Sequence, residues 1–157
     1  MEPFEGWYRA EHPRLLASMV LVTGSVDEAG EVTDEAFARA YERWERVGGM
    51  ESPGGWTYRV AVNVARRRGR RRALEERLLA RRRPPADVPA PAGEAWALVA
   101  ELPERQRVAV VLRYVADLPE AEIAAVMGVR RGTVAATLST ARRQLGAALV
   151  PEAVDGR

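Results

Sequence analysis

The sequence contains no cysteine and only one histidine, His12. The missing cysteines exclude disulfide bonds, and a single histidine supplies at most one of the ligands that an ordinary Cys/His zinc site needs. No apolar run approaches the ~18 residues of a membrane-spanning helix, and the N-terminus lacks the pattern of a signal peptide. We therefore expect a cytoplasmic protein without membrane insertion, metal or cofactor, in which His12 is an exposed or helix-capping residue.

Lysine is also absent, so all 24 of the Lys and Arg residues are arginine. The planar fork of donors on arginine suits phosphates and base edges. The charge is unevenly distributed: residues 1–59 hold 6 arginines against 11 acidic residues, whereas residues 66–83 hold 10 arginines against 2. A basic block beside an acidic half predicts one nucleic-acid surface and a separate protein-binding surface. The ordinary alternative for such a charge run is a solvated helix face.

Apolar residues recur at helical spacing along the chain, which predicts an all-α fold. Residues 4–22 fit a first helix that Pro13 should bend or restart. A second helix should begin at Ser25, which forms a capping box with Glu28, and should end at Gly48.

The third predicted helix starts at Ser52, a good N-cap, with Pro53 in its first position. Apolar residues, Val60 among them, cover one side of it. Its other side carries a polar stripe with Trp56 at the edge, made of Arg59, Asn63, Arg66 and Arg67. The arginine tract continues this stripe, so the helix should pack on one side and offer the other to a partner. For Trp56 and Tyr58, the alternative to a contact with this partner is simple packing in the protein core.

Four prolines between residues 84 and 91 mark an extended linker at residues 81–93, because such a segment cannot continue a helix. The predicted organisation is therefore two small helical domains, at residues 1–80 and 94–149, joined by this Pro-rich linker. Residues 150–157 should form a frayed tail.

The second domain has the pattern of a helix-turn-helix. Gly128 should end its first helix, and Val129 should fill the turn. The inner face of the following helix should hold Val134, Leu138, Ala141 and Leu145. The outer face should hold Gly132, Ala136, Ser139, Thr140 and Arg143. Most helical hairpins do not bind DNA, but the Gly-Val-Arg-Arg-Gly-Thr-Val turn favours a DNA-binding one.

Three segments, in this order, resemble the extracytoplasmic-function group of bacterial sigma factors. The core-polymerase-binding helix of that family resembles TDEAFARAYERW, and its −10 promoter helix resembles GWTYRVAVNVARRRGRR. Its −35 reading domain resembles LPERQRVAVVLRYVADLPEAEIAAVMGVRRGTVAATLSTARRQL. The resemblance implies a protein that binds core RNA polymerase, carries it to promoter DNA and helps to open the duplex. It also implies no catalytic residue, a monomer when free, and an anti-sigma partner like that of many relatives.

The resemblance further implies three sets of contact residues. Polymerase contacts would come from Asp34, Glu35, Phe37, Arg39 and Arg43, for which a solvated, salt-bridged face is the alternative. Contacts to flipped −10 bases and their backbone would come from Met50, Glu51, Ser52, Trp56, Arg59, Asn63, Arg66 and Arg67. Contacts to the −35 element would come from Arg130, Arg131, Thr133, Ala136, Ser139, Thr140, Arg142 and Arg143.

The chain departs from the family pattern in two places. The family often has basic residues where this chain has Ala135, Ala136, Thr137 and Thr140, which predicts a weaker or more apolar −35 contact. Asp34 stands where the family commonly has glutamine.

A stand-alone helix-turn-helix regulator is the competing interpretation, although residues 1–80 resemble neither a dimerisation nor a sensor domain. An enzyme is disfavoured, because the sequence shows no nucleophile–base pair, glycine-rich phosphate loop or metal-ligand cluster.

Overall fold

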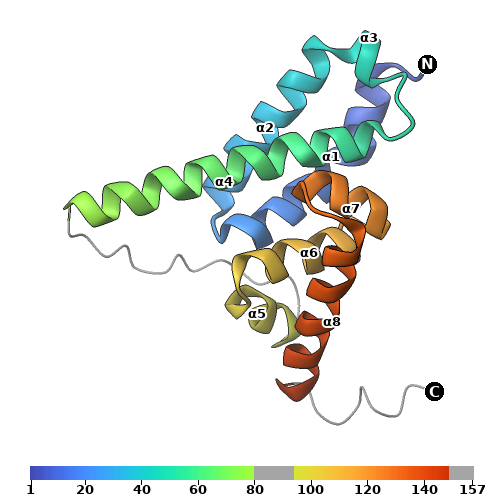
Figure 1. Ribbon diagram of the computed structural model, residues 1–157. Helices are drawn as coiled ribbons and strands as arrows, with labels where there is room; N and C mark the ends of the chain where they lie inside the picture. Colours follow the sequence, from blue (N-terminus) through green and yellow to red (C-terminus); the bar gives the residue numbers. More distant parts are fainter. Residues whose placement is uncertain (80–93, 149–157) are drawn as a thin grey trace. The chain divides into compact units, whose positions relative to one another are not determined.

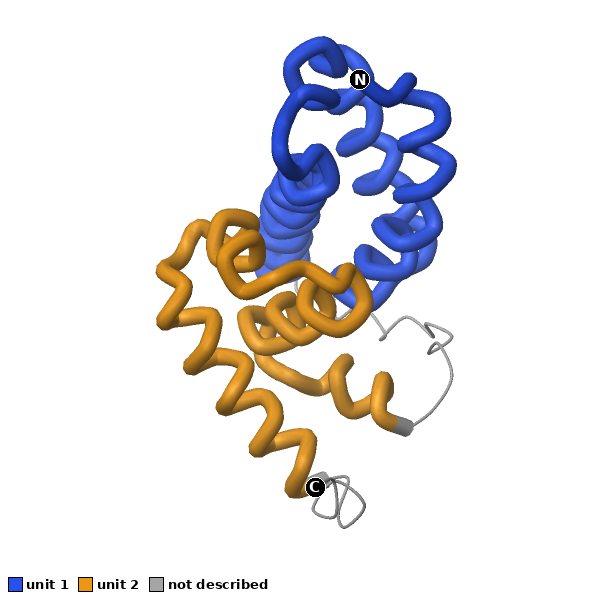
Figure 2. The backbone as a smooth tube through the Cα atoms, turned by 90° about the vertical axis from the view of Figure 1, so that its right-hand side faces the viewer, with its two compact units in different colours: residues 1–88 blue, residues 89–157 orange. Residues whose placement is uncertain are grey.

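The computed structural model describes residues 1–79 and 94–148, and within these ranges it contains eight helices and no strand (Figure 1). The predicted all-α fold is confirmed. The chain divides into two compact units, residues 1–88 and 89–157 (Figure 2). The predicted linker at 81–93 and the predicted tail at 150–157 lie outside the described residues.

The first unit contains four helices: α1 (Phe4–Thr23), α2 (Val26–Glu42), α3 (Trp44–Val47) and α4 (Pro53–Leu79). Helix α1 runs through Pro13 without the predicted restart. Both Pro13 and Arg9, whose carbonyl loses its helical donor at this proline, are exposed, so water can satisfy that carbonyl.

The second predicted helix is shorter than expected, because the chain leaves helical geometry at Arg43 (φ −115°, ψ 20°). Its start is confirmed, since the Glu28 amide donates to the Ser25 hydroxyl at 3.2 Å. Gly48 instead follows the short helix α3 with right-handed angles. A Cβ at Gly48 would lie 2.7 Å from the Trp44 ring, so glycine is needed there for close packing rather than for a left-handed turn.

The core of the first unit lies between α1, α2 and α4, which pack against one another (Figure 1). Leu15, Met19 and Val32 are almost fully buried in it. Tyr58 is 2% exposed, so the core-packing alternative holds for this residue.

One end of this core is closed by aromatic rings of α1, α2 and α3, including those of Trp7 and Phe37. His12 belongs to this cluster, with its ring 5.1 Å from Tyr8 and 5.6 Å from Phe37. The expectation of an exposed or capping histidine is therefore wrong, because the ring is half-buried among aromatic neighbours.

The second unit contains α5 (Glu94–Glu101), α6 (Glu104–Tyr114), α7 (Glu120–Met127) and α8 (Arg131–Ala148). Gly128 ends α7 in the left-handed conformation (φ 67°), and the Val129 amide bonds the Ala124 carbonyl at 3.0 Å. Val134 and Leu138 are buried on the inner side of α8. The predicted helix-turn-helix is thus confirmed.

Candidate nucleic-acid and protein interfaces

The N-terminal half of α4 has a buried side and an exposed polar side. The Ser52 hydroxyl accepts a hydrogen bond from the Gly55 amide at 3.0 Å, which caps the helix as its sequence predicts. Ala61 and Val62 are fully buried, and this fixes the rotation of the helix. The opposite side exposes Arg59, Asn63 and Arg67, whereas Trp56 and Arg66 are half-buried.

The arginine tract of α4 is divided between two environments. Arg68 forms ion pairs with Glu31 and, at 3.6 Å, with Glu35 of α2, and Arg72 pairs with Glu28 of the same helix. Three neighbouring arginines of the same helix are exposed instead, namely Arg67, Arg70 and Arg71. The structure therefore places only part of the basic block toward solvent.

Sequence reasoning treated this block as a single surface, although its helical phase contains the distinction. Ala61 and Ala65 are buried, and Arg68 and Arg72 continue their spacing of four and three residues along the same side of the helix. The acidic residues of α2 lie opposite that side, which explains why these two arginines turn inward.

The loop before α4 contributes less free surface than expected. Met50 is half-buried and Glu51 is exposed. The hydroxyl of Ser52 is engaged as the helix cap. The hydroxyl is the acceptor in this bond, so its own O–H can still donate to a base.

The outward side of α2 carries both signs of charge. Asp34 and Arg43 are exposed, and Arg39 bonds Glu35 at 2.6 Å. This pair fits the salt-bridged alternative as well as a docking surface.

Phe37 differs from the other predicted polymerase contacts because it is only 3% exposed. Its ring packs against Trp7, Tyr8 and His12. In this structure Phe37 packs inside the first unit, so the prediction that its side chain contacts the polymerase directly does not fit its burial.

Tyr41 is a large exposed residue of α2 that the sequence analysis did not single out. It is 67% exposed and lies seven residues after Asp34, so the two share one face of α2. Its signal was a large aromatic residue at an outward position of the helix.

The outer side of α8 is arranged as the sequence predicts. Arg130, in the turn before the helix, is exposed. The exposed residues of α8 include Arg131, Gly132, Thr133, Ala136, Ser139, Arg142 and Arg143. Thr140 is half-buried and accepts a hydrogen bond from Arg143 at 3.3 Å. Arg142 donates from Nε to the hydroxyl of Tyr114 on α6 at 2.7 Å, a partner that sequence reasoning did not identify.

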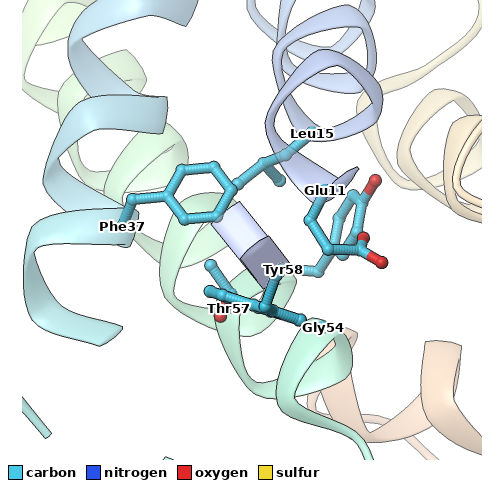
Figure 3. Close-up of a pocket in the computed structure, with 7 residues that line it drawn as sticks. Glu11, Leu15, Phe37, Gly54, Thr57 and Tyr58 are labelled. Carbon is cyan, nitrogen blue, oxygen red and sulfur yellow. The ribbon is translucent and has the colours of Figure 1, made fainter. Parts of the chain in front are cut away.

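A small pocket lies between α1, α2 and α4 (Figure 3). It is lined by Trp7, Glu11, Leu15, Phe37, Gly54, Thr57 and Tyr58. Burial raises the pKa of the Tyr58 hydroxyl to about 12, so this phenol stays neutral at ordinary pH. The walls are mostly apolar, with the Glu11 carboxylate and the Tyr58 phenol among them.

The described ranges contain neither a candidate metal site nor a candidate membrane span. No cluster of three or more His, Cys, Asp or Glu side chains in residues 1–79 and 94–148 could hold a metal ion. Among the helices described, none is long and apolar enough to cross a membrane.

Comparisons with known proteins agree with this geometry. The model of Sigma-70 region 2 matches residues 7–75, and that of Sigma-70 region 4 matches residues 92–145. The RNA polymerase sigma-E factor of Streptomyces coelicolor is 31% identical over 165 residues, covering 98% of this chain and 90% of the relative. The sigma-E factor of Streptomyces avermitilis is 28% identical over 160 residues, covering 98% and 89%.

A solved structure has the same fold. The sigma factor RpoE of Bartonella quintana, in its complex with the anti-sigma factor NepR, matches with a TM-score of 0.81 at 19% identity, covering 97% of this chain and 98% of that one. The family models and the full-length relatives together establish that the chain belongs to the extracytoplasmic-function group of sigma-70 factors, which bind RNA polymerase and direct transcription initiation from specific promoters.

Proposed function

We propose that the two units of this sigma factor divide promoter recognition between them. In the first unit, α4 and the preceding loop contact the −10 element, while the outward side of α2 docks on core polymerase. In the second unit, α8 contacts the −35 element. The observation that carries the proposal is the two-sided structure of α4, whose buried side holds Arg59, Asn63 and Arg67 outward in successive turns.

The exposed side of α4 has the chemistry that separated DNA strands require. Arg59 and Arg67 can neutralise phosphates, and each such contact to single-stranded DNA contributes about 0.7 to the salt dependence of binding. The amide of Asn63 can donate to and accept from a base edge. The half-buried ring of Trp56 can stack on a flipped base, a contact worth ~1–3 kcal/mol. Met50, Glu51 and Arg66 flank this surface.

The exposed side of α8 has the chemistry of a duplex-reading helix. Arg130, Arg131 and Arg143 can hold phosphates on either side of the major groove. Small residues occupy the centre of this side, and the methyl group of Ala136 suits contact with a thymine methyl. This arrangement supports a −35 contact that relies more on the backbone than on base-specific hydrogen bonds.

The outward side of α2 supplies the surface for the polymerase. Asp34, Glu35, Arg39 and Arg43 offer mixed charges, and the buried ring of Phe37 holds the helix in place. We infer that the chain has no catalytic role, because the polymerase performs the chemistry. We also infer that the chain and the polymerase act in the cytoplasm. An anti-sigma partner stays a prediction.

The test is transcription with purified core polymerase from the same source. Replacing Asn63 and Arg67 by alanine should abolish promoter opening, measured by permanganate reactivity of unpaired thymines, while core binding in a pull-down stays intact. The matched control is Arg105→Ala, which removes an exposed arginine of α6 outside the proposed surfaces. Loss of core binding in the Asn63/Arg67 variant, or normal opening by it, would contradict the proposed division.

A further inference from the structure

Tyr114, the last residue of α6, holds an arginine of α8 at the surface of the second unit. The tyrosine is 51% exposed. Arg142 donates from Nε to its hydroxyl at 2.7 Å, and the guanidinium carbon lies 5.8 Å from the ring centroid. One exposed phenol therefore fixes the guanidinium through a hydrogen bond and a cation–π contact.

The two arginines beside the Tyr114 ring differ in whether a carboxylate pairs with them. Arg113 also lies near the ring, with its guanidinium carbon 5.9 Å from the centroid, but it pairs with Asp117 at 3.6 Å. Arg142, by contrast, has no carboxylate partner among residues 1–79 and 94–148. A guanidinium that is held by a hydroxyl rather than by a carboxylate keeps its charge available for an external anion.

The hydrogen bond to Tyr114 also determines which N–H donors of Arg142 stay available for a ligand. Arginine has five N–H donors, and the bond to Tyr114 uses the one on Nε. The four donors on the two terminal nitrogens are left, and a phosphate accepts best from two such donors at once. A guanidinium that is already oriented loses less side-chain freedom when it binds.

We propose that Tyr114 is a positioning residue that orients Arg142 for contact with a backbone phosphate of duplex DNA. This inference rests on the proposed −35 role of α8. Tyr114 acts through Arg142, so removing its hydroxyl lowers the affinity for DNA without removing a charge from the interface.

The test uses the full chain and a labelled duplex of about 30 base pairs of arbitrary sequence, because phosphate contacts do not depend on sequence. Binding is followed by fluorescence anisotropy over a series of salt concentrations. Arg142→Ala should lower the slope of log K against log salt by ~0.9. Tyr114→Phe should leave the slope unchanged but weaken binding about three- to tenfold, the effect of one hydrogen bond. In the Arg142→Ala background, Tyr114→Phe should have no further effect.

A second readout and a control separate positioning from a structural effect. The Nε–H resonance of Arg142 should be resolved and slow to exchange in the unsubstituted chain, and it should lose that protection in Tyr114→Phe. The matched control is Tyr8→Phe, which removes a hydroxyl from the first unit and should leave DNA affinity unchanged.

Each other outcome overturns a defined part of the reasoning. If Tyr114→Phe weakens binding equally in both backgrounds, or not at all, Tyr114 does not act through Arg142. If Arg142→Ala leaves the slope unchanged, the proposed phosphate contact itself fails. No measurable binding by the unsubstituted chain at low salt would overturn both.

Discussion

The division of the arginine tract predicts opposite behaviour for two neighbouring residues of α4. Arg67 is exposed, whereas Arg68 pairs with Glu31 and Glu35 of α2. Replacing either by alanine removes one positive charge from the same turn. Only Arg67→Ala should remove a DNA contact, because Arg68 is already neutralised by the protein's own carboxylates.

The expected magnitudes follow from counterion release. Loss of one phosphate contact lowers the slope of log K against log salt by ~0.7 on single-stranded DNA, the form that the exposed side of α4 is proposed to bind. Between about 50 and 200 mM salt, binding by Arg67→Ala should therefore change roughly threefold less than binding by the unsubstituted chain. Arg68→Ala should keep the original slope. Its Glu31 partner is 66% exposed, so its loss should cost at most ~1 kcal/mol of unfolding free energy.

Anisotropy titrations with a labelled single-stranded oligonucleotide measure the slopes, and urea unfolding measures the stabilities. Equal reductions of slope in the two variants would show that the ion pairs with α2 do not withhold Arg68 from DNA. An unchanged slope for Arg67→Ala would refute the assignment of this side of α4 to DNA.

Three further predictions concern the stability of the first unit. The pKa of Tyr58 is raised to about 12, so the free energy of unfolding should fall by up to ~3 kcal/mol as pH rises from about 10 to 12. Tyr58→Phe should remove this fall. A fall that persists in the variant would exclude Tyr58 as its cause. Thr33→Val should raise unfolding free energy by ~1 kcal/mol, because the buried Thr33 hydroxyl lacks a hydrogen-bond partner in the described structure, and a destabilised variant would show that this hydroxyl is satisfied. Gly48→Ala should lower the free energy of unfolding by ~1–3 kcal/mol, since the new Cβ would overlap Trp44. Gly30→Ala, at a helical site with open space, should raise it by ~0.5–1 kcal/mol. Urea unfolding of both variants measures the two changes, and equal changes would contradict the packing argument.

Features that depend on a few neighbouring residues were predictable from the sequence. The caps at Ser25 and Ser52 and the turn at Gly128 each require only local chemistry, and all three are present. The buried and exposed sides of α8 follow from helical spacing in the same way.

Features that depend on distant residues were not predictable in this way. The burial of Phe37 depends on packing against Trp7 and Tyr8 of α1. After the break at Arg43, Trp44 lies against Trp7 of the same helix. The pairing of Arg72 joins residues 44 positions apart, and that of Tyr114 with Arg142 joins residues 28 apart. Helical phase limits such partners to one side of a helix, but only the fold chooses between them.

The most direct test of the central claim is run-off transcription from duplex promoter fragments by purified core polymerase of the same source, with and without this chain. We predict specific start sites only when the chain is present, and loss of these transcripts in the Asn63/Arg67 variant despite normal core binding. Specific transcripts that persist in that variant would contradict the account of α4 as the −10 reader. A chain that neither binds core polymerase nor yields specific transcripts would contradict its role as a sigma factor.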